Sequence, residues 1–296
     1  MCIRDRYEAL ETYLVQKGAN KGKTFHAAAQ RACAYLVEAC GAKDLADYTR
    51  TDALKYRDYL IAKGMAGSSV SRVISSIRAV MNFAISEYAL ELKNPFIGMY
   101  HDRLAGVSKR LPIPIEDIRK VQQQCLFLDD DLRWLVALVS DTGMRLAEVA
   151  GLLKSDIILD EDIPFIRLQP HPWRKLKTSG SERDVPHVGV SLWAAQRLLE
   201  ACPDSVYAFP RYNKTSNTNA NSASAALNKW LHPYVPVGCT MHSFRHSMRD
   251  RLRAVECPAD VVDQIGGWVT GGIGQGYGSG YGPEVCYKWM RKMEEK

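Results

Sequence analysis

The sequence predicts a mainly α-helical protein with a small β-sheet, divided into a helical N-terminal domain and an α+β C-terminal domain. Three observations support this fold class. Apolar residues recur at helical spacing from Tyr7 to about residue 92. A basic stretch containing glycine and proline follows at residues 103–114. Beyond it, helical patterns flank a β-rich stretch at residues 163–185. The 296 residues also exceed what one average domain requires.

Helices are expected throughout the first domain, residues 1–102. They are Tyr7–Lys17, Thr24–Cys40, Asp52–Lys63 and a fourth that begins near Ser68 or Ser69 and runs through Ile85. Gly41 is expected to stop the second helix, and Thr51 to cap the third through its hydroxyl group. Asn94-Pro95 is expected to end this block, because a residue before proline avoids the helical conformation.

Residues 103–114, RLAGVSKRLPIP, are expected to form an extended, cationic linker. Such a linker suits a chain that wraps around a DNA duplex, and an ordinary solvated loop fits the composition equally well.

The second domain, residues 115–296, is expected to combine helices with a β-hairpin. The expected helices are Ile115–Gln124, Asp131–Asp141, one starting near Met144, Ser191–Ala201, Ala223–Leu231 and Ser243–Val255. The expected strands are Ile163–Leu168, Trp173–Lys177 and Arg183–Val185. In the final stretch, Val285, Trp289 and Met293 recur every four residues. This spacing indicates a helix that docks either on a neighbouring subunit or on its own domain.

Overall charge and cysteine usage narrow the function only slightly. The net charge of +6 is compatible with a polyanionic partner, as it is with many soluble proteins that bind none. The eight cysteines form no CxxC pair and no cluster with zinc-site spacing, so free thiols in a reducing compartment are expected. No apolar run approaches the ~20 residues that a membrane span requires. We therefore expect no membrane association and no metal.

Two arginine-containing motifs are candidates for binding a phosphodiester under attack. Fixed guanidinium groups suit the negative charge that develops when a phosphodiester is attacked. Arg145 follows a Thr-Gly helix break, and Glu148 lies three residues on, where it can hold the guanidinium; a surface ion pair is the alternative. His242 and Arg245 are three residues apart, which places both on one helical face; a solvated basic face is the alternative.

Two further segments offer a proton donor and a nucleophile. Lys175 and Lys177 lie in the expected hairpin, two residues apart and therefore on the same side of a strand. The motif Ile-Gly-Gly-Trp268 leads into a glycine-rich segment that contains Tyr277 and Tyr281. Glycine disfavours helix, so a mobile segment carrying a tyrosine is expected there, and a plain flexible tail is the alternative.

The motifs TGMRLAEV, KLKTSGSERDVP, HSFRHS, IGGW and a downstream tyrosine follow one another over residues 141–277. Their order and spacing resemble those of the tyrosine recombinases, the phage integrase family of site-specific DNA recombinases. The resemblance covers nearly all of the second domain. The helical first domain is similar to the core-binding domain of that family, and the second to its catalytic domain.

The resemblance implies a role for each matched position. Arg145 and Arg245 match the two catalytic arginines, and Glu148 the acidic residue that supports the first. Lys177 matches the catalytic lysine, with Lys175 as the alternative.

The remaining positions complete the set. His242 matches the histidine of the HxxR box, and Trp268 a position that is histidine in most members and tryptophan in some. Tyr277 matches the nucleophile, with Tyr281 as the alternative. The glycine density around Tyr277 departs from the family, whose members usually carry this tyrosine on or beside a helix.

The resemblance further implies strand cleavage and rejoining through a 3′-phosphotyrosyl link, without metal or cofactor. The implied partner is double-stranded DNA, clamped by two domains, with a homotetramer on two DNA sites. Such enzymes serve DNA integration and mobile elements in the cytoplasm of bacterial or phage-infected cells, at the nucleoid. The alternatives are a type IB topoisomerase and a catalytically silent DNA-binding protein; the intact set of candidate residues argues against the silent protein.

Overall fold

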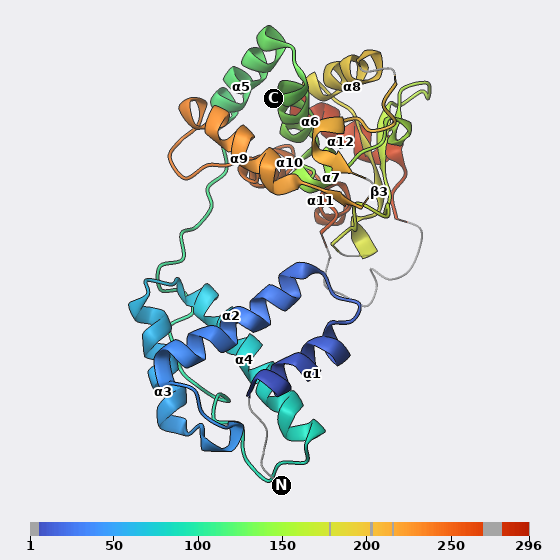
Figure 1. Ribbon diagram of the computed structural model, residues 1–296. Coiled ribbons are helices and arrows are strands. Elements are labelled where there is room, and N and C mark those ends of the chain that lie inside the picture. The colour runs from blue at the N-terminus through green and yellow to red at the C-terminus, as the bar shows by residue number, and fades with distance from the viewer. Residues whose placement is uncertain (1–5, 178, 202–203, 215, 269–279, 296) are drawn as a thin grey trace. The chain divides into compact units, whose positions relative to one another are not determined.

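The computed structural model describes residues 6–177, 179–201, 204–214, 216–268 and 280–295. The chain divides into two compact units, Met1–Lys109 and Arg110–Lys296 (Figure 1). This boundary falls inside the stretch expected as a linker. The predicted fold class is confirmed, because helices dominate both units and the strands form only small sheets.

The first unit is a group of four α-helices with one apolar core. They are α1 (Arg6–Gly18), α2 (Lys23–Cys40), α3 (Arg50–Ala62) and α4 (Gly67–Glu87). Helix α2 packs against the other three. Tyr56 is fully buried between them, and its hydroxyl group donates a hydrogen bond of 2.9 Å to the carbonyl of Ala32. The buried phenol therefore has the partner that a polar group in a core requires.

Two helix starts in this unit differ from the prediction. The cap of α3 is Thr49 rather than Thr51, because Thr49 and Asp52 form a reciprocal capping box. Helix α4 begins at Gly67, and neither Ser68 nor Ser69 caps it. A Cβ atom at Gly67 would lie 2.0 Å from the carbonyl oxygen of Asp102, so only glycine fits at this position, and its N–H donates to the carbonyl of Ala105 at 2.7 Å.

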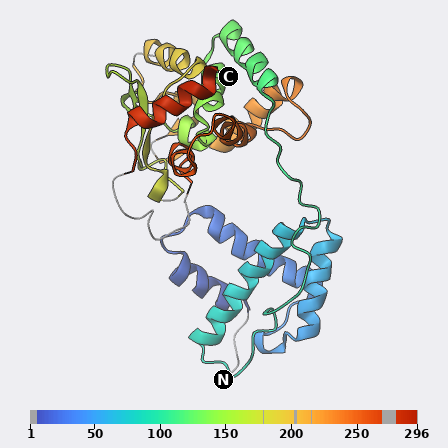
Figure 2. The ribbon, with the colours of Figure 1, turned by 180° about the vertical axis from the view of Figure 1, so that it is seen from behind.

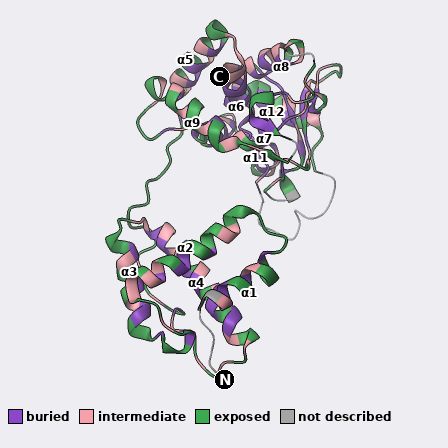
Figure 3. Cartoon of the chain, viewed as in Figure 1, coloured by how far each residue is buried: buried purple, intermediate pink, exposed green. Residues whose placement is uncertain are grey.

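In the second unit, other helices surround a central one. The helices are α5 (Ile115–Leu128), α6 (Asp131–Thr142), α7 (Leu146–Ala150), α8 (Val190–Glu200), α9 (Ala220–Leu231), α10 (Ser243–Ala254), α11 (Ala259–Gly266) and α12 (Pro283–Glu295). Helix α6 is buried from residue 134 to its end, and it packs against α5, α7, α8 and α10 (Figure 3). Because α6 is enclosed, the residues that follow it have a rigid base.

A three-stranded antiparallel sheet lies beside these helices. Its order is β1 (Ile157–Ile158), β2 (Phe165–Leu168) and β3 (Arg183–Pro186), and Leu168 pairs with Arg183. A separate two-stranded ribbon joins β4 (Asn213–Lys214) to β5 (Asn217–Thr218).

The prediction of a strand at Trp173–Lys177 is wrong. Strand β2 pairs directly with β3 across the whole intervening segment. Within that segment, His171 and Arg174 form an isolated bridge, and the His171 ring contacts the buried carboxylate of Asp156 at 2.8 Å. The segment is thus a loop that contacts Asp156 through the side chains of His171 and Arg174.

Helix α12 packs on its own unit, where it contacts β3, α10 and α11 (Figure 2). Its buried residues are Cys286, Met290 and Met293, whereas Val285 is exposed. Of the two docking arrangements expected from sequence, the structure contains the one within the chain. Among the described helices, none is long and apolar enough to cross a membrane.

Candidate active site

The break between α6 and α7 presents Arg145. Gly143 turns the chain in a left-handed conformation with φ of 59°, which glycine adopts without strain. A Cβ atom there would also lie 2.2 Å from the sulfur of Met248 on α10, so the turn packs directly against that helix. Arg145 follows as the N-cap residue of α7. The turn that carries Arg145 is therefore fixed at two places: it continues from the buried helix α6, and it packs against α10.

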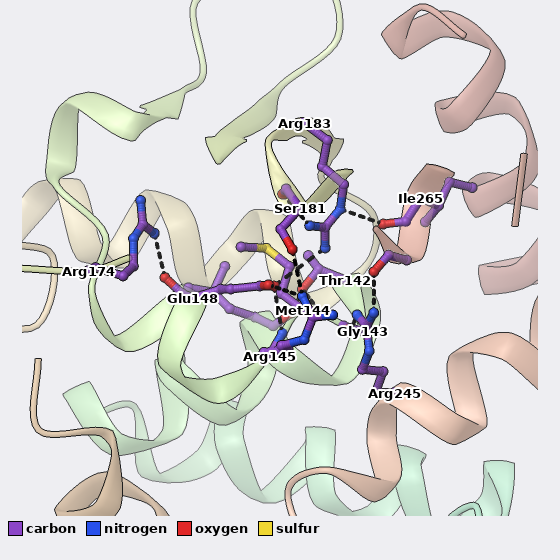
Figure 4. Close-up of polar contacts among 12 residues, drawn as sticks. Thr142, Gly143, Met144, Arg145, Glu148, Arg174, Ser181, Arg183, Arg245 and Ile265 are labelled. Carbon is purple, nitrogen blue, oxygen red and sulfur yellow. Dashed lines mark hydrogen bonds and ion pairs between the residues drawn. The ribbon is translucent and has the colours of Figure 1, made fainter. Parts of the chain in front are cut away.

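Glu148 and Ser181 hold the Arg145 side chain (Figure 4). Arg145 Nη1 lies 2.5 Å from Glu148 Oε1 and donates a hydrogen bond of 3.1 Å to Ser181 Oγ. The backbone N–H of Arg145 donates to the other carboxylate oxygen of Glu148 at 2.9 Å. Because Glu148 is only 4% exposed, the contact is a partly buried ion pair, and the alternative of a surface ion pair does not fit.

Arg245 projects from α10 toward the same turn (Figure 4). Its Nη1 donates to the carbonyl of Gly143 at 3.0 Å, and its Nη2 donates to the carbonyl of Gly266. Burial and the nearby charges of Arg145 and Arg183 lower the pKa of Arg245 to about 9. The guanidinium therefore remains charged at neutral pH, and it is buried rather than part of a solvated face.

His242 is the residue just before α10, rather than one in its first turn. Partial desolvation and the cations Arg110, Arg245 and Arg145 lower the pKa of His242 to about 4. The ring is thus neutral at pH 7 in the DNA-free protein, and the structure places it within the electrostatic reach of both arginines.

Trp268 follows the end of α11 and packs on guanidinium groups. Its ring centroid lies 4.2 Å from the guanidinium carbon of Arg245 and 4.8 Å from that of Arg249, both cation–π distances. A Cβ atom at Gly266 would lie 1.8 Å from the indole, so glycine is needed there for the ring to fold back. Trp268 therefore connects Arg245 and Arg249 of α10 to the end of α11.

Lys175 and Lys177 are both exposed and lie between Arg174 and the short 3-10 turn Ser179–Ser181. Since this segment is not a strand, the expectation that they share a strand face fails. Neither lysine is favoured by the fold, and both remain candidates.

Tyr277 lies outside the described residues. Tyr281, its alternative, is described: its hydroxyl group donates a hydrogen bond to Asp260, and its backbone N–H donates to Gln264 at 2.7 Å. The hydrogen bond to Asp260 raises the pKa of Tyr281. The phenol of Tyr281 is therefore held against the carboxylate of Asp260.

Sequence reasoning missed three residues that contact Arg145 or Glu148: Ser181 accepts a hydrogen bond from Arg145, Arg174 donates to the carbonyl of Glu148 at 2.7 Å, and Arg183 lies 3.5 Å from the Glu148 carboxylate. The signal was a charged residue, Arg183, at the start of a strand that lies in the core. Within the described part of the chain, no three His, Cys, Asp or Glu side chains are grouped in a way that could hold a metal ion.

A family model described as the phage integrase family matches residues 117–278, more than half of the chain. The chain belongs to this family. The matched range contains the positions from Arg145 to Tyr277 that the sequence resemblance singled out, and the alternative Tyr281 lies beyond its end.

Individual relatives of this phage integrase family member agree with the assignment. Tyrosine recombinase XerD of Halalkalibacterium halodurans is 30% identical over 156 residues, which cover 51% of this chain and 48% of that protein. The match thus spans about half the length of this relative.

Solved structures share the fold at low sequence identity. The Tn1549 transposon integrase, in complex with circular intermediate DNA, is 16% identical with a TM-score of 0.68, covering 92% of this chain and 97% of that one. A lambda integrase tetramer bound to a Holliday junction is 14% identical with a TM-score of 0.69, covering 92% of this chain and 76% of that one.

Proposed function

We propose that this protein is a site-specific DNA recombinase that cleaves and rejoins strands through a 3′-phosphotyrosyl intermediate. The observation that carries the proposal is the convergence of Arg145 and Arg245 on one turn, Thr142–Arg145, with Glu148 as the supporting carboxylate. Two fixed guanidinium groups suit the non-bridging oxygens of a phosphate under attack. The family membership supports the same chemistry.

In the proposed reaction, the phenolic oxygen of Tyr277 forms a bond to the phosphorus and gives its proton to solvent water as it attacks. The bond to the 5′-oxygen breaks, and Lys177 gives that oxygen a proton. Arg145 and Arg245 neutralise the negative charge of the transition state. Attack by a 5′-hydroxyl group reverses the step, so the ester energy is retained and no ATP is consumed.

His242 and Trp268 have supporting parts in this proposal. A neutral imidazole can still donate one hydrogen bond to a phosphate oxygen. Trp268 packs on the face of the Arg245 guanidinium and thereby fixes the orientation of the guanidinium plane. The indole N–H is a second hydrogen-bond donor.

The proposed partner is double-stranded DNA, bound by a helical core-binding domain, residues 1–102, and a catalytic domain, residues 115–296. We further propose a homotetramer on two DNA sites, as in the lambda integrase tetramer on a Holliday junction. Because the proposed substrate is cellular DNA, we propose that the enzyme acts in the cytoplasm, at the nucleoid.

A trapping assay tests the proposal against its alternatives. The probe is a pool of nicked suicide duplexes with a randomised core, from which covalent protein–DNA adducts are isolated under denaturing conditions and sequenced. We expect adducts that enrich a defined sequence. A silent DNA-binding protein forms no adduct. A type IB topoisomerase gives adducts without strong enrichment and relaxes supercoiled plasmid as a monomer.

The role of Lys177 can be tested by changing the leaving group. A 5′-bridging phosphorothiolate leaves without a proton, so it bypasses a general acid. Lys177→Ala is expected to cleave normal DNA slowly and to recover substantially on the sulfur substrate, while Arg245→Ala gains far less. Lys175→Ala is the matched comparison, since it removes an equally exposed lysine two residues away. Rescue of Lys175→Ala alone would transfer the role to Lys175, and rescue of neither would point to His242 or water.

A further inference from the structure

Arg183 is a buried arginine whose side-chain donors point to Glu148, Ser181 and Ile265. Its side chain is 4% exposed. Nε donates to the carbonyl of Ile265 at 2.8 Å, Nη1 donates to the carbonyl of Ser181 at 2.7 Å, and Nη2 lies 3.5 Å from Glu148 Oε2 (Figure 4). These three acceptors come from α11, from the turn before β3 and from α7. Burying a guanidinium costs free energy unless its donors are paired, so these three contacts are needed to offset the desolvation of Arg183.

Two of these contacts support Arg145 indirectly. The Glu148 carboxylate stands between two cations, with Oε1 at 2.5 Å from Arg145 and Oε2 at 3.5 Å from Arg183. Ser181 receives Arg145 at its hydroxyl oxygen and Arg183 at its carbonyl oxygen. Arg183 therefore holds both groups that accept hydrogen bonds from the Arg145 guanidinium.

The third contact supports Arg245. Ile265 directly precedes Gly266, whose carbonyl accepts a hydrogen bond from Arg245. A Cβ atom at Gly267 would lie 2.6 Å from Arg183 Nη1, so a glycine lets the end of α11 pass directly over the guanidinium. Arg183 thus contacts residues that hold Arg145 and a residue next to one that holds Arg245.

We propose that Arg183 is a positioning residue that sets the placement of Arg145 and Arg245 before DNA binds. It does so by holding Glu148, Ser181 and Ile265 together. The inference rests on the proposed phosphate chemistry of the two arginines. The side-chain donors of Arg183 are directed at these protein acceptors, so its effect on a bound phosphate passes through the three residues.

The first test is Arg183→Lys, with single-turnover cleavage measured at saturating DNA and well below the unfolding temperature. One ammonium group cannot replace three directed donors. A misplacement of the reacting groups by ~1 Å slows a reaction about 100-fold, so we expect a fall of roughly 10- to 100-fold. DNA affinity should change by less than about threefold, because no DNA contact is removed. On the 5′-bridging phosphorothiolate the variant should remain slow, since the defect lies with the arginines.

Arg133→Met is the matched control. Arg133 lies in the first turn of α6, pairs with Asp130 at 3.2 Å, stacks on Trp230 and has a side chain only 16% exposed. Its loss should lower the unfolding temperature without changing the cleavage rate of the folded protein. Equal rates for wild type and Arg183→Lys would overturn the inference, as would full rescue of Arg183→Lys by the sulfur substrate.

A double-mutant cycle and a spectroscopic measurement complete the test. Arg183→Lys and Glu148→Gln should be non-additive in the cleavage rate, because the first acts through the second; additive losses would contradict the inference. The side-chain NMR resonance of Arg145, assigned by its loss in Arg145→Lys, should shift in Arg183→Lys and stay in place in Arg133→Met. This signal needs no cleavage. An absence of adducts with wild-type protein would therefore count against the proposed function alone, and an unmoved resonance against the positioning role alone.

Discussion

Tyr277→Phe is expected to abolish covalent protein–DNA adducts completely. The substitution removes the one oxygen that can form the phosphotyrosyl ester and keeps the aromatic ring. DNA binding should remain close to normal, since the substitution leaves the arginines proposed to bind phosphate unchanged. Adduct formation on nicked suicide duplexes, resolved on denaturing gels, measures the first effect, and a mobility-shift titration measures the second.

Tyr281→Phe is the matched control for this experiment. The Tyr281 phenol donates a hydrogen bond to Asp260, which raises the pKa of Tyr281, so its loss should remove one exposed hydrogen bond and leave adduct formation intact. The opposite result, with adducts from Tyr277→Phe and none from Tyr281→Phe, would move the nucleophile to Tyr281.

Arg145→Lys and Arg245→Lys should each slow cleavage by about 100-fold or more. Lysine retains the charge but cannot present a planar fork to two phosphate oxygens. Loss of one donor that acts in the transition state costs roughly 3–4 kcal/mol in comparable oxyanion sites. For Arg245 the loss has a second source, because the guanidinium bridges the carbonyls of Gly143 and Gly266.

Single-turnover rates at saturating DNA measure this effect, with thermal unfolding as a check on folding. Arg133→Lys serves as the control, since it changes an arginine of the same unit that pairs with Asp130, at the other end of α6 from Gly143. A near-normal rate for Arg145→Lys would mean that the contact with Glu148 is structural only, and that Arg245 acts without it.

The sequence alone determined the fold class and the motif order. Helices such as α2 and α6 follow from local signals, namely apolar spacing and a glycine after the last turn, which act within a few residues and need no tertiary partner. Arg145 with Glu148 was also predictable, because a separation of three residues brings the two side chains together wherever a helix starts.

Only the tertiary structure decided which residues hold the site together. Arg183 contacts Glu148 and Ile265, which lie 35 and 82 residues away, and Arg245 contacts Gly143 across 102 residues. No local pattern encodes such contacts. The same reason applies to the loop before Lys177, where His171 contacts the buried Asp156, and to the first residue of α4, where the backbone of Asp102 leaves room only for glycine. Burial and pairing across the chain decide these features, since the free energy of a buried charge depends on partners that sequence spacing does not reveal.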